Sequence, residues 1–166
     1  MRGTSIIELI IYGAILALLS VFAINTFLLI SSAFGEVRLT RQVNASAELI
    51  MGRMIREIRF GKSVYASSVF GVHPSRLSFV TFTSPSDDTE VDGDIQVSGM
   101  NLLFQKGSAG AIQLNTDDVG VTNFVLREIT SANSVAVKIE LELQASTTKR
   151  AVTKKFYGTA VMRGSY

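Results

Sequence analysis

The chain has 166 residues, with 16 Lys and Arg against 14 Asp and Glu, and no cysteine. This length fits one modest folded domain plus an extension, and the domain must be held by its own apolar core, because disulfides and thiolate metal sites are excluded. The nearly balanced charge leaves no basic stripe of the kind used to bind nucleic acid, so no nucleic-acid partner is inferred.

The first predicted element is a long apolar helix. No charged residue occurs in residues 9–35. A helix over residues 6–34 would be about 43 Å long, more than the roughly 30 Å of a bilayer's hydrocarbon core. A secretory signal peptide has a shorter apolar run before its cleavage site, so the pattern predicts an anchor that stays on the protein.

Glu8 places a carboxylate inside this apolar region. A charged group in hydrocarbon costs a few kcal/mol or more and is expected to have a partner. In one interpretation Glu8 lies close enough to the N-terminus to reach the lipid headgroups. In the other, its partner is a cation on another protein subunit.

The sequence RGTSIIELII at residues 2–11 bears on this choice. It resembles the processing site of type IV prepilins and pseudopilins, in which a basic leader ends in glycine and glutamate is the fifth residue of the mature apolar helix. The resemblance implies that a prepilin peptidase cuts between Gly3 and Thr4 and methylates the amino group of Thr4. Thr4 stands where phenylalanine is usual, and the leader of residues 1–3 is short.

Cleavage after Gly3 has a direct electrostatic consequence. It creates an α-amino group that is largely protonated at neutral pH. In a fibre, this amine of one subunit can face Glu8 of a neighbour. Removing one partner of such a pair costs about 3 to 5 kcal/mol, so the pair would select the register of assembly, and Glu8 is the predicted assembly residue.

An amphipathic helix follows over residues 35–60. Its apolar stripe consists of Val43, Ala47, Ile50, Met51, Met54, Ile55 and Ile58, and the opposite face carries Arg38, Arg41, Gly52, Arg56 and Arg59. A helix from about Ser5 to Phe60 would be about 80 Å long, with Gly61 as its stop. The arginines either are solvated or paired with Glu48 and Glu57, or contact a neighbouring subunit or anionic headgroups.

Alternating patterns after residue 62 predict antiparallel strands. They cover residues 77–82, 95–97, 101–105, 111–114, 123–126, 135–143 and 155–162, with a polar linker at 145–149. The apolar side of residues 135–143 is expected to pack on the helix stripe. The predicted fold class is α+β, a long N-terminal helix on an antiparallel β-sheet head, and the order of the last strands also resembles minor pilins and pseudopilins.

An acidic segment supplies the one metal candidate. Asp88, Glu90, Asp92 and Asp94 alternate as in the first half of a calcium loop, but the closing acid is missing and its place falls on Gly99. The alternative is an ordinary solvated hairpin loop. No cofactor is therefore predicted apart from a weak calcium candidate.

No catalytic site is predicted. His73 stands alone beside Pro74 and is interpreted as a turn residue. Residues 106–110 are glycine-rich but lack the phosphate-binding spacing, and are interpreted as a hairpin turn. With no nucleophile and base in a recognisable arrangement, we do not expect an enzyme.

Together these observations divide the chain into a leader (1–3), a membrane or filament-core helix (4–34), a spacer helix (35–60) and a β-rich head (61–166). The resemblance implies a pilus or pseudopilus subunit in the inner membrane, with other pilin-like subunits, the prepilin peptidase, the assembly platform and lipid as partners. Arg2 precedes the span and Arg38 and Arg41 follow it. This count alone would keep the head in the cytoplasm, whereas the resemblance places it outside. The alternative function is an anchored adhesin or DNA receptor.

Overall fold

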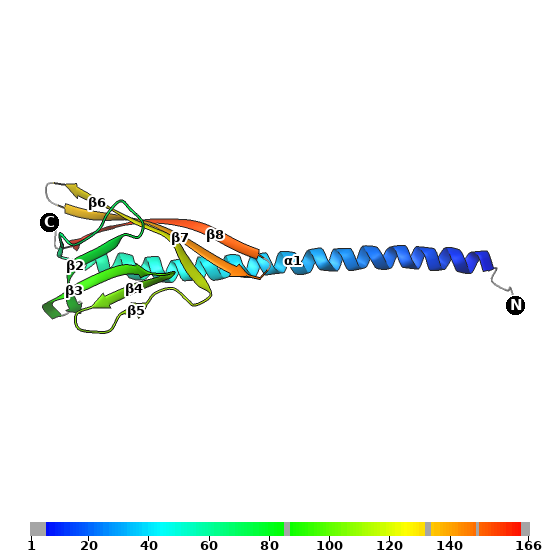
Figure 1. The fold of residues 1–166 in the computed structure, drawn as a ribbon, viewed down its shortest axis with the longest axis horizontal. Coiled ribbons are helices and arrows are strands. Elements are labelled where there is room, and N and C mark those ends of the chain that lie inside the picture. The colour runs from blue at the N-terminus through cyan, green and yellow to red at the C-terminus, as the bar shows by residue number, and fades with distance from the viewer. Residues whose placement is uncertain (1–5, 85–86, 132–133, 149, 164–166) are drawn as a thin grey trace. The chain divides into compact units, whose positions relative to one another are not determined.

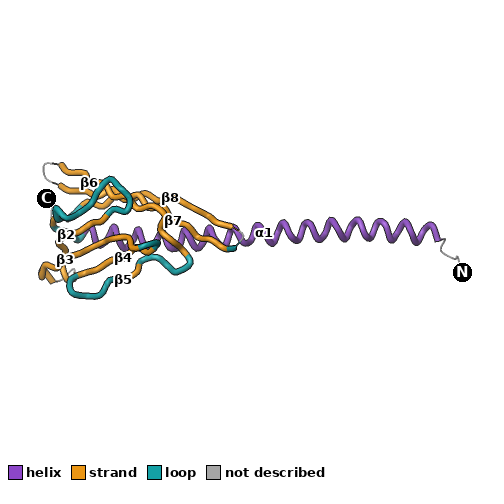
Figure 2. The backbone as a smooth tube through the Cα atoms, viewed as in Figure 1, coloured by secondary structure: helices purple, strands orange, loops and turns teal. Residues whose placement is uncertain are grey.

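The computed structural model describes residues 6–84, 87–131, 134–148 and 150–163. They form one α-helix, α1 (Ile6–Arg59), and two antiparallel sheets, which confirms the predicted α+β class (Figures 1 and 2). The chain divides into two compact units, with the boundary between Arg38 and Leu39. Helix α1 contributes its first half to one unit and its second half to the other.

The described part of the first unit is α1 from Ile6 to Arg38. Its large apolar side chains are exposed, and none of its most apolar 18-residue stretch is buried. Because the residues are good helix formers without a proline, the helix is uninterrupted from Ile6 onward. This part of α1 is long and apolar enough to cross a membrane.

In the second unit, α1 buries one face. The predicted stripe is confirmed at Val43, Ala47, Ile50, Met54 and Ile58, and the structure adds Leu39, Ser46 and Glu57. The helix ends at Arg59, and the Gly61 N–H donates to the Ile58 carbonyl at 2.9 Å. A Cβ at Gly61 would lie 2.9 Å from that oxygen, so the predicted stop needs glycine for this close approach.

The first sheet has five strands in the order β1-β2-β3-β4-β5. They are β1 (Ser63–Val64), β2 (Arg76–Ser84), β3 (Asp87–Ser98), β4 (Asn101–Lys106) and β5 (Ile112–Gln113). The second sheet has the order β6-β7-β8, with β6 (Val119–Ser131), β7 (Ser134–Thr147) and β8 (Arg150–Val161). All neighbouring strands are antiparallel.

Two expectations about the head are wrong. The acidic segment 87–94 is not a loop but the first part of β3, paired with β2 from Ser84↔Asp87 to Ser78↔Asp94. The expected linker at 145–149 is largely strand, since β7 and β8 pair as far as Thr147↔Arg150. In both places the backbone ladder continues through polar residues, because cross-strand hydrogen bonds do not require apolar side chains.

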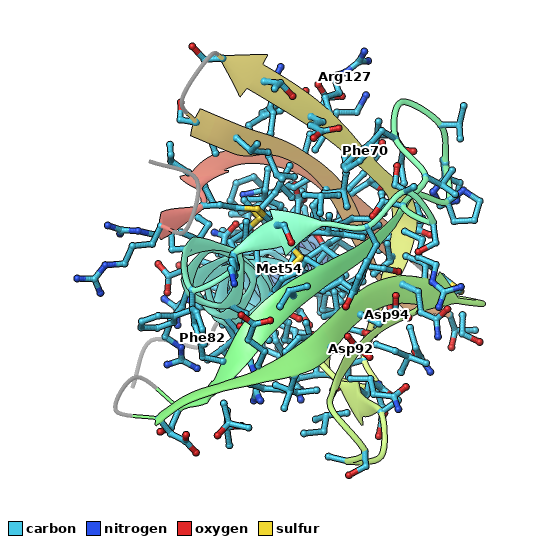
Figure 3. The ribbon with its side chains drawn as sticks, turned by 90° about the vertical axis from the view of Figure 1, so that its left-hand side faces the viewer. Met54, Phe70, Phe82, Asp92, Asp94 and Arg127 are labelled. Carbon is cyan, nitrogen blue, oxygen red and sulfur yellow. The ribbon has the colours of Figure 1, made fainter. Side chains whose placement is uncertain are left out.

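One hydrophobic core joins the second half of α1 to both sheets. Strand β7 alternates as predicted, burying Val137, Ile139, Leu141 and Leu143 in the same cluster as Ile50 and Met54 of the helix. Figure 3 shows Met54 among the packed side chains between helix and strands. The helix is therefore part of the head's core.

Candidate functional site

Glu8 lies in the first turn of α1 and is exposed. It is the one charged residue in residues 6–35. The Tyr12 hydroxyl, one turn further along the helix, donates a hydrogen bond to Glu8 Oε1 at 3.0 Å. Sequence reasoning missed Tyr12, although its spacing of four residues puts it on the same helix face as Glu8.

Hydroxyl residues further along the apolar helix bond to its own backbone. Ser20 donates to the Leu16 carbonyl at 2.8 Å, and Thr26 donates to the Phe22 carbonyl at 2.9 Å. Glu8 differs, since within residues 6–84, 87–131, 134–148 and 150–163 its carboxylate has a hydroxyl partner but no cation. The predicted cleavage site, Gly3 and Thr4, lies outside the described residues.

Three of the four calcium candidates, Glu90, Asp92 and Asp94, lie along the outer face of β3 and have protein partners of their own. Glu90 forms an ion pair with Lys62, and Asp92 accepts from the Tyr65 hydroxyl at 2.6 Å. Asp94 accepts from Arg76 Nε at 2.9 Å and Nη2 at 3.0 Å. Figure 3 shows Asp92 and Asp94 on the side of β3 away from Met54.

These carboxylates are spread out rather than convergent. Alternate residues of a strand are about 6.6 Å apart, which is too far for side chains with separate partners to surround one ion. Among the described residues no group of three acidic, histidine or cysteine side chains is placed to hold a metal, and the Asp88 side chain lies outside them. The hydrogen bond to Asp92 raises the pKa of the Tyr65 phenol, and that to Asp94 raises the pKa of Arg76.

The two remaining motifs are turns. His73 is exposed, and its Nδ1 accepts the Phe124 backbone N–H at 3.0 Å, which ties the turn to β6. The glycine-rich segment 106–110 ends β4 and begins the turn to β5, with Gly107 at a φ of 58°, a left-handed conformation that favours glycine. His73 and the segment 106–110 therefore both lie at turns of the chain, as predicted.

A hollow of about 800 Å³ lies in the second unit between α1 and β8. It is lined by Gly52, Ile55, Arg56, Arg59, Phe60, Thr159, Val161 and Arg163. We call it the arginine groove. Arg56 is 3.8 Å from Glu57, whereas Arg59 and Arg163 form no ion pair with a described residue. The other expected acid, Glu48, also has no ion pair in the described part of the chain.

Sequence reasoning found only part of this groove. The helical pattern placed Arg56 and Arg59 on one exposed face, but it gave no reason to join them with Arg163, more than a hundred residues later. Comparison of the chain with models of protein families, with curated proteins and with solved structures gave no match. The assignment of function therefore depends on residues 2–11 and on the geometry of α1.

Proposed function

We propose that the chain is a membrane-anchored, non-enzymatic structural subunit, a minor pilin or pseudopilin, of a type IV pilus, competence pilus or type II secretion pseudopilus. The observation that carries this proposal is the division of α1. Residues 6–35 of α1 expose apolar side chains around a single acid, while its second half is built into the core of the head. The resemblance of residues 2–11 to a prepilin processing site supports it.

The exposed half of α1 needs an apolar environment. Side chains such as Leu18 at 74 % and Phe22 at 72 % exposure are stable in lipid or against other apolar helices, but not as a continuous surface in water. A filament subunit meets both environments in turn, first the membrane and then the neighbouring helices of the fibre. The second half of α1 keeps the head attached in either state.

Glu8 then acts as the assembly residue. Tyr12 gives its carboxylate a hydrogen bond within one subunit but no counter-charge. After cleavage between Gly3 and Thr4, the new amine of a neighbouring subunit supplies that charge, and the resulting pair fixes the register of the helices. The head faces the outside of the cytoplasmic membrane, and the assembly platform and prepilin peptidase act at the membrane.

The test has two parts. Mass spectrometry of the chain from cells with an active prepilin peptidase should find a mature N-terminus at Thr4 carrying a methyl group, and an intact Met1 would overturn the proposal. Glu8→Ala should remove the chain from isolated filaments, with an expected loss of about a hundredfold or more. Glu48→Ala, an exposed acid on the same helix, is the matched control and should be incorporated normally.

Tyr12→Phe separates the two interactions of Glu8. It removes the hydroxyl that donates to Glu8 but leaves the carboxylate that pairs with the amine. We expect incorporation to fall by no more than about tenfold, because a hydrogen bond to a charged group contributes less than a buried ion pair. A Tyr12→Phe loss as complete as that of Glu8→Ala would contradict the pairing scheme.

A further inference from the structure

Strand β8 has a long open edge. It is the outer strand of the order β6-β7-β8, and among the residues that the structure describes β7 is its one paired strand. The Met162 N–H donates to the Val135 carbonyl at 2.9 Å. The backbone N–H and C=O groups of the even-numbered residues in this stretch therefore point toward β7. By alternation, the backbone N–H and C=O groups of Thr159 and Val161 point away from the sheet.

Only the first half of this edge carries charged residues of the kind that block the addition of another strand. Lys154 points inward, donating to Asn44 Oδ1 at 3.3 Å, and Lys155 follows it. Residues 156–162 contain neither a charge nor a proline. Inward lysines and prolines are the common means of blocking strand addition, so the second half of β8 is open to another strand.

The arginine groove runs beside this open half. Its β8 side is lined by Thr159 and Val161, and Arg163 lies just after the end of that strand. Its α1 side is lined by Arg56 and Arg59. Ile55 and Phe60 add apolar surface, and none of the lining residues is acidic. The groove thus offers backbone hydrogen bonds, guanidinium groups and an apolar floor side by side, which suits an extended segment with acidic side chains.

The chain itself contains such a segment at the start of β3. Residues 87–92 pair with β2, whereas pairing with β4 begins only at Gly93↔Lys106. The Gly107 N–H donates to the Asp92 carbonyl at 2.7 Å, so by alternation the backbone groups of Glu90 point away from β2. Because Asp92 is bonded to Gly107, the part of this segment without a β4 partner is residues 87–91, which we call the acidic edge.

The charges of the acidic edge are available for exchange. Asp87 and Glu90 are exposed. Asp87 Oδ1 accepts from the Thr89 backbone N–H at 3.0 Å and from its hydroxyl at 2.7 Å, which are neutral donors and leave the charge of Asp87 without neutralisation by them. The Lys62–Glu90 pair has side chains 51 % and 49 % exposed. An exposed pair of this kind contributes at most about 1 kcal/mol. A second set of cations can therefore replace Lys62 at little cost.

We propose that the acidic edge of one copy of this chain adds to the open half of β8 in a second copy, with Asp87 and Glu90 meeting the arginines of the groove. The two surfaces are different, so the contact is heterologous and leaves one free edge of each kind at the ends. Repetition produces an open chain of heads. The contact uses head residues alone and does not depend on Glu8.

Cysteine cross-linking of the full chain in detergent micelles tests the pairing, because the chain has no native cysteine. Thr159→Cys and Thr89→Cys chains, mixed and oxidised by dioxygen with copper phenanthroline, should give a disulfide dimer. Each variant alone should give none, and the double variant should give a ladder. A mixture of Thr159→Cys with Ser98→Cys, at the far end of β3, is the control. Equal cross-linking in the control, or in either single variant, would overturn the proposal.

Charge exchange tests the role of the arginines. Arg56→Glu with Arg59→Glu in the Thr159→Cys chain should reduce the dimer at least about tenfold, since like charges then face each other. A Thr89→Cys partner carrying Asp87→Lys and Glu90→Lys should restore it. Arg38→Glu with Arg41→Glu, on the same helix but outside the groove, should leave the dimer unchanged.

Thermal unfolding monitored by circular dichroism verifies that each variant is folded. If folded variants show no loss, or if the exchanged pair does not restore the dimer, the proposal is wrong. Glu8→Ala should leave the cross-link in detergent intact. A failure of filament incorporation is thereby distinguished from a failure of head pairing.

Discussion

Ile50 provides the sharpest test of the way α1 enters the head. Its side chain is 0 % exposed in the core cluster, whereas its neighbour Leu49 is 67 % exposed. Ile50→Ala deletes three carbon atoms, which loses about 2.4 kcal/mol of transfer free energy. The cavity left between helix and sheets raises the expected loss in the free energy of unfolding to about 3 to 4 kcal/mol.

The assay is thermal unfolding of the detergent-solubilised chain, monitored by the β-sheet signal in circular dichroism. For a unit of this size the expected loss lowers the midpoint by about 10 to 15 °C. Leu49→Ala, a similar truncation one residue away, should change it by no more than about 2 °C. Equal effects of the two variants would refute the conclusion that one face of α1 forms the head's core.

Two further predictions concern the sheets. Gly93→Ala should lower the free energy of unfolding of the head by about 1 to 3 kcal/mol in chemical unfolding, because its Cβ would lie 2.8 Å from the buried Phe79 ring. Gly110→Ala, which has open space around it, is the control and should be neutral. Lys138 lowers the pKa of Glu140 below its usual range, so this contribution to stability is present above the unfolded-state pKa and is lost as the pH falls through the folded value. The thermal midpoints of Glu140→Gln and the unchanged chain should therefore differ at pH 7 and converge in acid; a constant difference would contradict the assignment.

The features of α1 could be predicted because they depend on local sequence. An apolar run without charge, a stripe at helical spacing and a glycine at the end specify a helix wherever it lies. The buried positions Val43, Ile50 and Met54 and the stop at Gly61 followed from this periodicity. Glu8 was noticeable for the same reason, since one acid in an apolar helix requires a partner.

The acidic segment shows where local sequence was insufficient. Carboxylates at alternate positions suit either a calcium loop or one face of a strand, and nothing within residues 87–94 distinguishes the two. Lys62, Tyr65 and Arg76 decide the outcome, because each holds one carboxylate on the exposed face of β3. These partners become neighbours only when β1, β2 and β3 pair.

The sequence by itself therefore determined a long apolar helix with a single acid, an amphipathic continuation and an alternating β-rich head. The tertiary structure decided which strands have open edges and which charges face them. It brings Arg163 beside Arg56 and Arg59, and among the described residues it leaves positions 87–91 of β3 without a paired strand on the β4 side. The physical reason is that helix hydrogen bonds join residues four apart, whereas sheet pairing joins residues at any separation. Local pattern thus specifies the helix, while strand edges exist only after the sheets have formed.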